Sequence, residues 1–251
     1  WDVEPLQDAY NQLQFMELYY NFLNMDSDRY VLDGKLWQVL LAARELDPDN
    51  LPADARNWVN RRLQYTHGYG LAMSPATGFT PEEGRPKFFV EDIPIRGEIP
   101  IERPELYYGE SPAPFAIVNS LAPEIDPSGS DLHYDGPGGV NLGSTFRRLA
   151  YAWQFADINI LLSDQVSSDT RIQYRRQISN RVKALAPFLT MDEDPYPVVD
   201  ESGKIWWLQD AFTTTDRYPY STLTDEGFNY IRNSVKAVVD AFSGEVSIYV
   251  M

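Results

Sequence analysis

Two histidines, several closely spaced aspartates and a run of arginines are the residues of this chain that could do chemistry. His67 stands in QYTHGYG, between aromatic side chains and glycines. A helical metal site would need a second histidine or an acid three or four residues away, and neither is there. No G-x-S-x-G motif supplies a serine nucleophile. We therefore assign no catalytic residue and predict a buried His67 ring with satisfied hydrogen bonds. Ligand binding by His67 and Tyr69 is the alternative.

Four aspartates have a spacing that suits a hard cation. Asp126 and Asp131 belong to the loop DPSGSDLH, which ends at His133 and resembles a tight calcium loop without the distal glutamate of an EF-hand. Asp192 and Asp194 alternate in MDEDPY, a spacing that also suits calcium or magnesium. We predict no cofactor, because Asx and Ser turns have the same composition without any ion. Calcium at these aspartates is the alternative.

Arginines are concentrated in the segment 171–181. If this segment is helical, Arg171 and Arg175 lie one turn apart on one face and could bind a phosphate or a carboxylate. Pairing with the acids at 192–194 is the alternative. Neither a Walker loop nor G-x-G-x-x-G is present, so no nucleotide site is predicted.

Charge and composition exclude several classes of function. The 251 residues carry a net charge of −16, which argues against a nucleic-acid partner. The charge is uneven, because residues 144–186 hold 7 basic and 3 acidic side chains between two acidic segments. The chain has no cysteine, which excludes disulfides, thiol nucleophiles and cysteine-bound metals. No run of 18 apolar residues could span a bilayer.

The pattern of apolar residues and turns predicts the elements that position these side chains. Helical spacing follows Pro5 through residues 6–23, and two further helices are expected at 144–157 and 167–187. Gly-containing turns predict hairpins; they lie at Asp33-Gly34, Ser202-Gly203 and Ser243-Gly244. The fold class is therefore α+β, with antiparallel hairpins and sheets and segregated helices. The turn-dense segment 126–143 is the predicted boundary if there are two lobes.

Several long stretches together resemble uncharacterised protein family 0182. They are, in chain order, WDVEPL, DSDRY, WVNRRLQYTHGYG, PELYYGE, APFLTMDEDPY, QDAFTTTDRYPYS and YIRNSVKAVVDAFSGEVSIYV. The resemblance covers essentially the whole chain. It implies a bacterial integral-membrane protein in which several N-terminal transmembrane helices precede a large region outside the cytoplasm. Residues 1–251 would be the extracytoplasmic fragment of that longer protein, anchored to the membrane through helices that this sequence lacks. The family has no established activity, so the resemblance implies no catalytic residues.

The expected function is a non-enzymatic binding, sensing or assembly module of the bacterial cell envelope. Rigid aromatics and Gly/Pro-rich loops suit such a recognition surface. Its partner would be an envelope ligand, another protein or a second copy of the chain. The alternative is a metal-assisted extracytoplasmic hydrolase that uses His67 or His133 with Asp126, Asp192 or Asp194.

Overall fold

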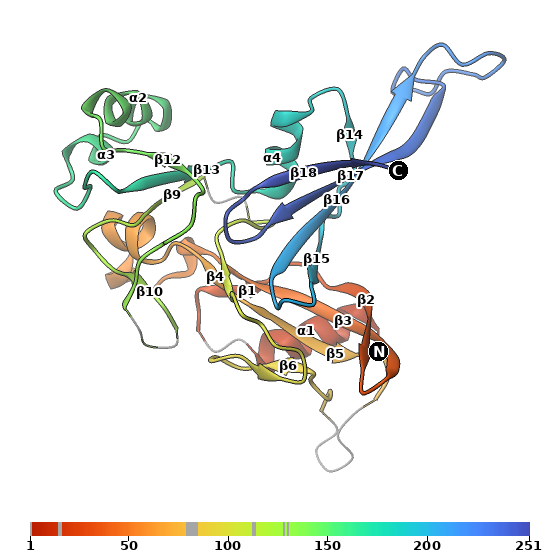
Figure 1. Cartoon of the computed structure of the whole chain (residues 1–251), viewed down its shortest axis with the longest axis horizontal. Coiled ribbons are helices and arrows are strands. Elements are labelled where there is room, and N and C mark those ends of the chain that lie inside the picture. Colours follow the sequence, from red (N-terminus) through yellow and green to blue (C-terminus); the bar gives the residue numbers. More distant parts are fainter. Residues whose placement is uncertain (1, 15–16, 79–84, 112–113, 128, 130) are drawn as a thin grey trace.

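The computed structural model arranges the chain around three antiparallel sheets and two short ribbons (Figure 1). It describes residues 2–251 except 15–16, 79–84, 112–113, 128 and 130. One cluster of buried side chains joins the N-terminal and C-terminal sheets. The third sheet and its helices lie at one side of this body (Figure 1). The predicted α+β class is confirmed. Among the described helices, none combines the length and the hydropathy needed to cross a bilayer.

The N-terminal sheet is built around one long central strand. Its strands are β1 (Tyr20–Phe22), β2 (Asp26–Leu32), β3 (Lys35–Leu46), β5 (Leu71–Pro75), β6 (Val90–Glu91) and β7 (Arg96–Gly97). β3 pairs with β1 and β2 on one side and with β5 on the other. The predicted turn is confirmed, because Leu32 pairs with Lys35 and both Asp33 and Gly34 have positive φ. Two left-handed residues give the twist that a two-residue hairpin turn requires.

Helix α1 (Val3–Leu13) covers one face of this sheet. Leu6 and Tyr10 are its buried residues, and the Tyr10 hydroxyl lies 2.9 Å from the carbonyl oxygen of Leu40. The helix predicted for 6–23 is wrong beyond Leu13, because Tyr20–Phe22 forms β1 instead. Aromatic residues favour a pleated, half-buried surface, and this short strand buries Tyr20 and Phe22 while pairing with the end of β3. Packing against the sheet thus overrides the helical spacing.

The C-terminal sheet contains the two hairpins predicted near the end of the chain. Its strands are β14 (Thr190–Met191), β15 (Tyr196–Val199), β16 (Ile205–Thr215), β17 (Tyr230–Asp240) and β18 (Val246–Val250). Gly203 and Gly244 have positive φ in the turns that join β15 to β16 and β17 to β18. Both predicted turns are therefore confirmed. Beyond the body, β16 and β17 continue outward as a long two-stranded arm (Figure 1).

The third sheet corrects the prediction of a helix over 167–187. It comprises β9 (Phe115–Val118), β12 (Val140–Asn141) and β13 (Arg171–Tyr174), covered by α2 (Thr145–Phe155) and α3 (Asn159–Leu162). β13 pairs with β9, and α4 (Ile178–Leu185) begins only afterwards. Arg175 has a φ of +51°, which interrupts the regular backbone between strand and helix. The apolar pairs that Ile172 and Tyr174 make across β9 account for the strand.

Short elements complete the connections. They are the helical turns η1 (Pro48–Asn50), η2 (Ala53–Ala55) and η3 (Asn60–Gln64), the ribbon of β4 (Gly68–Tyr69) with β8 (Glu105–Leu106), and the ribbon of β10 (Glu124–Ile125) with β11 (Asp131–Leu132). The predicted lobe boundary at 126–143 spans the end of the second ribbon and β12. A division into two lobes stays a prediction.

Trp207 is the largest fully buried side chain and lies in the cluster that joins the two main sheets. Its indole Nε1 donates a hydrogen bond of 2.9 Å to the carbonyl oxygen of Tyr108. Trp206, the preceding residue of β16, points to the opposite face and is only half-buried. Its Nε1 donates to Asp200 at 2.7 Å. The two neighbouring tryptophans therefore differ in burial, although the indole of each donates a hydrogen bond.

We expect Trp207→Ala to lower the free energy of unfolding by about 3–5 kcal/mol, because it opens a cavity and leaves the Tyr108 carbonyl without its donor. Trp206→Ala is the matched control and should cost less than about half as much. Urea denaturation of both variants measures the difference. Equal losses would show that Trp207 does not hold the two sheets together.

Candidate functional site

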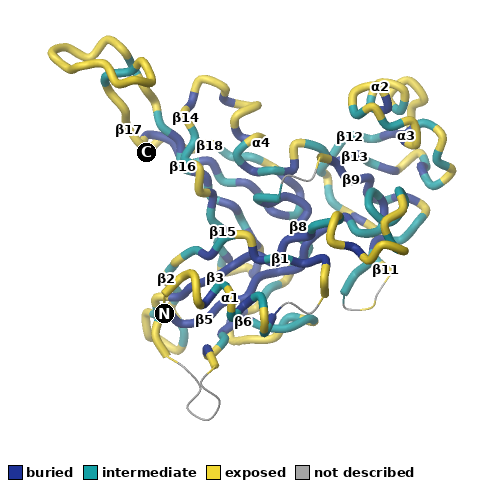
Figure 2. Tube along the Cα trace, turned by 180° about the vertical axis from the view of Figure 1, so that it is seen from behind, coloured by how far each residue is buried: buried dark blue, intermediate teal, exposed yellow. Residues whose placement is uncertain are grey.

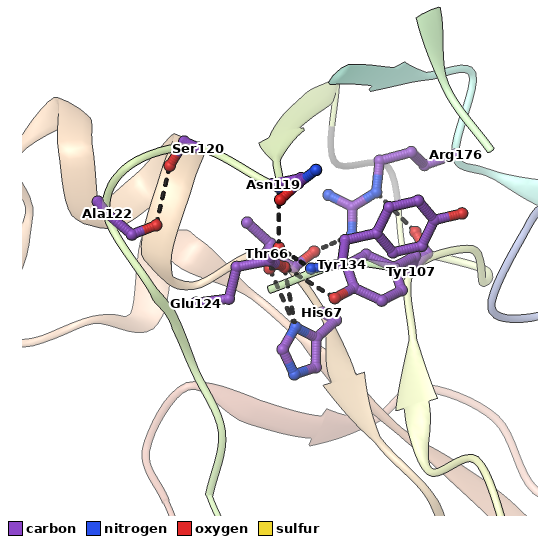
Figure 3. Close-up of polar contacts among 9 residues, drawn as sticks. All are labelled: Thr66, His67, Tyr107, Asn119, Ser120, Ala122, Glu124, Tyr134 and Arg176. Carbon is purple, nitrogen blue, oxygen red and sulfur yellow. Dashed lines mark hydrogen bonds and ion pairs between the residues drawn. The ribbon is translucent and has the colours of Figure 1, made fainter. Parts of the chain in front are cut away.

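The His67 ring lies at the edge of a buried polar network in which most contacts converge on Glu124 (Figure 3). Thr66 and His67 connect η3 to β4, and the His67 side chain is fully buried. Its Nδ1 lies 3.0 Å from the Thr66 hydroxyl and 3.7 Å from Oε2 of Glu124. The predicted burial is confirmed, and a hydroxyl and a carboxylate are the polar neighbours of Nδ1. The prediction that the ring's hydrogen bonds are satisfied does not hold for its second nitrogen, because Nε2 has no hydrogen-bond partner within the described part of the chain.

The Glu124 carboxylate collects donors from four separate segments (Figure 3). Oε2 accepts hydrogen bonds from the hydroxyls of Thr66 at 2.5 Å and Tyr107 at 2.8 Å. Oε1 accepts from the backbone amides of Asn119 at 3.2 Å and Tyr134 at 3.0 Å. A buried charge of this kind is tolerated only when its oxygens are fully hydrogen-bonded. The network therefore ties the ends of η3, β8, β9 and β11 to one point.

Hydrogen bonding decides the ionisation of Glu124. Burial by itself would raise the pKa of this carboxyl, but the neighbouring His67 ring and the hydrogen bonds from Thr66 and Tyr107 outweigh it and hold the pKa below its usual value. For the Tyr107 hydroxyl, burial and the neighbouring Glu124 charge act together and raise its pKa well above the usual value. Glu124 is therefore an acceptor and Tyr107 a donor at neutral pH.

Arg176 extends the network toward a second buried carboxylate. Its guanidinium donates to the backbone carbonyls of Tyr107, at 2.6 Å, and Thr66. The charge of Glu45 acts on it, and both side chains lie deep in the fold. Glu45 in turn accepts hydrogen bonds of 2.7 Å from the backbone amides of Glu110 and Ser111. Burial raises the pKa of Glu45, and the two amides and the charge of Arg176 act in the opposite direction without cancelling it.

A mixed-charge hollow lies beside Glu45 and not beside His67. It has a volume of about 290 Å³, and its charged and hydroxyl lining includes Glu45, Asp49, Arg61, Arg62 and Ser111. Asp49 already pairs with Arg61. The His67 ring and the Glu124 carboxylate are sealed from solvent and do not line this hollow. Chemistry on a substrate needs access to the reacting group, so the His67 network acts in the structure as a clamp between segments.

The predicted ligand-binding residues lie in three different settings. Tyr69 is buried in an aromatic cluster with Tyr19 and Tyr20. Arg171 is not on a helix; its guanidinium donates to the backbone carbonyls of residues 137, 138 and 139. Arg175 is exposed and lies beside the hollow between α2 and α4. The predicted helical pairing of Arg171 with Arg175 is therefore wrong. Ligand binding by these residues and by His67 stays a prediction.

The aspartates predicted for a cation occupy two distant places. Asp126 and Asp131 lie at the β10–β11 ribbon, where Ile125 pairs with Asp131. Asp192 and Asp194 lie in the turn after β14, where the Asp194 amide donates to Asp192 Oδ1 at 3.3 Å. Over the residues that the structure describes, no three His, Asp or Glu side chains are grouped so that they could hold a metal ion. A calcium site at these aspartates stays a prediction.

Asp194 is exposed but lies near two half-buried acids, Asp26 and Glu110. It accepts a hydrogen bond from the Asn24 side chain. Burial, and then the charge of Asp194, raise the pKa of Asp26 to about 7. Burial, followed by the charges of Glu45, Asp26 and Asp194, raises the pKa of Glu110 to about 8. These carboxyls lie too close together to ionise as freely as isolated acids.

Sequence reasoning missed the three charged residues that organise this region. Glu124 sits in SLAPEIDPSG with no spacing that marks it, and its donors come from up to 58 residues away. Glu45 could have been suspected, because it interrupts the apolar run VLLAARELD of a buried strand. Arg176 was counted among a row of arginines, and only the strand before it shows that its side chain turns inward.

Comparison with known proteins places the chain among proteins without an assigned activity. The model of the Uncharacterised protein family (UPF0182) matches residues 1–251. A UPF0182 protein of Pelotomaculum thermopropionicum is 48% identical over 256 residues, covering 100% of this chain and 28% of that relative. Those of Desulforamulus reducens and Sulfurovum sp. are 46% and 47% identical with the same coverage. The chain thus spans 28% of the length of these curated relatives. No solved structure matches it.

We expect His67→Ala to lower the free energy of unfolding by about 2–4 kcal/mol, because it leaves a cavity and breaks the contact with Thr66 and Glu124. His133→Ala, at the exposed histidine, is the control and should change it by less than about 0.5 kcal/mol. Thermal melting and urea denaturation measure both. Unchanged melting of the His67 variant would rule out a structural role for the ring.

Glu110 gives a prediction about pH. Its folded pKa of about 8 lies above the ordinary value of 4.5, so the folded state binds the extra proton. The stability that this provides is complete below pH 4.5 and is lost as the pH rises through about 8. Glu110→Gln cannot ionise, so its melting temperature should exceed that of the wild type at pH 9 and approach it at pH 5. Glu201→Gln, in an exposed turn, is the control. Melting curves across this range provide the measurement, and a Glu110 variant with no pH-dependent difference from the wild type would contradict the prediction.

Proposed function

The chain belongs to the uncharacterised protein family UPF0182, and from that premise we propose that it is an assembly module of a longer, membrane-anchored envelope protein. Its β16–β17 arm would dock on another protein surface outside the cytoplasm. The observation that carries this proposal is the arm itself, which is ordered, aromatic and exposed on both faces. The buried His67 network supports the same conclusion, because it offers a clamp and no open reaction site.

The arm differs from the rest of its sheet. Residues 205–211 of β16 alternate between buried and half-buried, as expected for a strand with one face in the core. Beyond a register shift between Ala211 and Phe212 this alternation stops, and residues 216–227 are all exposed. Figure 2 shows this part of the chain projecting away from the body. A bulge re-aims a hairpin, so the register shift marks where the arm leaves the core.

The arm is held in shape without a core. Tyr218 and Tyr230 stack with their ring centroids 4.7 Å apart. The Asn229 side chain accepts from the Tyr218 amide at 2.9 Å and donates to the carbonyls of Tyr218 at 2.8 Å and Ser221 at 3.1 Å. The hydroxyls of Thr213 and Ser234 bridge the strands at 2.8 Å. These contacts order the arm before it meets a partner, which reduces the entropy lost on binding.

Exposed aromatic and aliphatic side chains give the arm the composition of a contact surface. They include Tyr218, Tyr220, Leu223, Tyr230 and Ile231. The Tyr220 side chain is fully exposed. Tyrosine is enriched at protein interfaces because it combines a large apolar ring with a hydroxyl and few rotatable bonds. A contiguous apolar surface on an isolated hairpin is unfavourable in water, so a partner surface that covers it would stabilise the protein.

The position outside the cytoplasm is part of the same proposal. It rests on the layout that the sequence resemblance implies, in which transmembrane helices precede a large external region. The chain spans only 28% of the curated relatives named above, which leaves most of each longer protein to supply an anchor and a docking surface. For the alternative of a metal-assisted hydrolase, no three His, Asp or Glu side chains among the described residues are grouped so that they could hold the metal.

Two single cysteines in the full-length protein test the proposal, because these 251 residues contain none. Ser221→Cys lies on the arm, and Glu201→Cys lies in the exposed turn between β15 and β16. In a cysteine-free background, a membrane-impermeant maleimide should label Glu201→Cys in intact cells. It should label Ser221→Cys at least about tenfold more slowly until detergent releases the partner.

Two results would contradict the proposal. If both cysteines react only after the membrane is permeabilised, the domain faces the cytoplasm. If both react equally fast in intact cells, the arm is free and does not dock. A Tyr220→Ser change added to Ser221→Cys should restore fast labelling, because it removes an apolar contact while keeping the arm's internal clamp.

A further inference from the structure

Helix α2 has two apolar faces, and the structure covers only one of them. Tyr151, Ala152 and Phe155 pack inward against the cluster that includes Leu63 and Ile160. On the opposite side, Phe146, Leu149 and Trp153 point away from the protein and are exposed. A surface helix normally has one apolar stripe and one polar face. A second stripe at positions i, i+3 and i+7 therefore indicates that something outside the described residues covers α2.

The outer stripe continues onto α3 and forms one corner of the molecule. Phe146 is 78% exposed and Trp153 is 88% exposed. Ile158 and Leu162 of the neighbouring helix are 56% and 71% exposed. We call these four residues and Leu149 the α2–α3 corner. Figure 2 shows both helices at the outer edge of the structure, with mostly exposed and half-buried residues.

This corner belongs to the one basic part of an acidic chain. Residues 144–186 carry 7 basic and 3 acidic side chains, against a net charge of −16 for the whole. Arg147, Arg175 and Lys183 are exposed. Arg175 and Lys183 line the same hollow as Gln154 and Phe155, the last two residues of α2, so exposed positive charge lies beside the C-terminal end of this helix.

We propose that the α2–α3 corner docks on an anionic lipid surface, with its Phe, Leu, Trp and Ile side chains at the headgroup–acyl boundary. An interfacial helix combines these apolar residues on one side with nearby Lys and Arg that attract acidic headgroups. Tryptophan in particular prefers the membrane–water interface. A second copy is disfavoured as the occupant, because two chains of −16 repel each other. The same repulsion turns the acidic body away from the bilayer and leaves the basic corner facing it.

This inference goes beyond the proposed arm and uses a different surface. The arm and the α2–α3 corner lie at opposite sides of the molecule (Figure 1). One surface can therefore contact lipid while the other contacts protein. Its biological setting rests on the proposed position beside a membrane, but lipid binding itself can be measured on the purified 251-residue chain.

The test is co-sedimentation of the chain with vesicles of phosphatidylcholine, with and without roughly one third phosphatidylglycerol. The wild type should bind the mixed vesicles and bind phosphatidylcholine alone at least about tenfold more weakly. Replacing Phe146, Leu149 and Trp153 together by serine should weaken binding to mixed vesicles by at least about tenfold. These side chains are exposed, so the triple variant should melt like the wild type.

Two further variants separate lipid contact from general stickiness. Replacing the exposed Tyr220, Leu223 and Val250 by serine removes comparable apolar area elsewhere and should leave vesicle binding unchanged. Trp153→Phe should keep the binding but lose most of the fluorescence quenching by brominated lipid, because it removes the tryptophan placed at the interface.

Each contrary result overturns the inference. No sedimentation with mixed vesicles, or equal binding to phosphatidylcholine alone, excludes an anionic lipid surface. Loss of binding in the Tyr220, Leu223 and Val250 variant places the contact elsewhere. If sedimentation velocity instead shows a dimer that the α2 triple variant abolishes, the corner binds a second copy. None of these outcomes affects the cysteine-labelling test of the arm, so the two proposals can fail separately.

Discussion

The organisation of this protein depends on a buried carboxylate that is hydrogen-bonded by four parts of the chain. Glu124 holds the segments that follow η3, β8, β9 and β11, and two of its donors are backbone amides, which only a substitution by proline would remove. An unpaired charge at such depth would cost several kcal/mol, roughly the margin by which a whole domain is stable. The carboxylate is therefore stable in the interior only when all four segments are in place, so we expect this region to fold and unfold cooperatively.

Arg176 connects the hydrogen-bond network around Glu124 to the N-terminal sheet. Through the carbonyls of Thr66 and Tyr107 it fixes the backbone that carries two of the donors to Glu124. Through the charge of Glu45 it couples the same point to the end of β3 in the N-terminal sheet. Because Arg176 also precedes α4, one guanidinium relates the N-terminal sheet, the β4–β8 ribbon and the α4 region. Buried polar networks of this kind specify one arrangement among many that an apolar core alone would tolerate.

Local patterns in the sequence were enough to predict the hairpins and the fold class. The turn at Asp33-Gly34 needs two left-handed residues, and few dipeptides supply them, so its signal is local and strong. The segment 171–175 has no such signal. Its arginines suit a helix, and only pairing with β9, more than 50 residues earlier, makes it a strand. The candidate site was harder to predict than the fold. His67 could be singled out by its residue type, but the role of Glu124 depends on donors that come together only in the folded chain.

Charge and exposed apolar surface are distributed unevenly, so that the two ends of the molecule differ in character. Polar groups such as Glu124 and His67, which are costly to bury, are sealed inside, while large apolar side chains remain exposed at the arm and at the α2–α3 corner. A stable soluble protein has little reason to expose Trp153 and Tyr220 while burying a carboxylate. The two surfaces also differ in character: one is a tyrosine-rich hairpin next to acids, and the other is a Phe/Leu/Trp stripe next to arginines. That difference favours two unlike neighbours, held at opposite sides of a body that the Glu124 clamp keeps rigid.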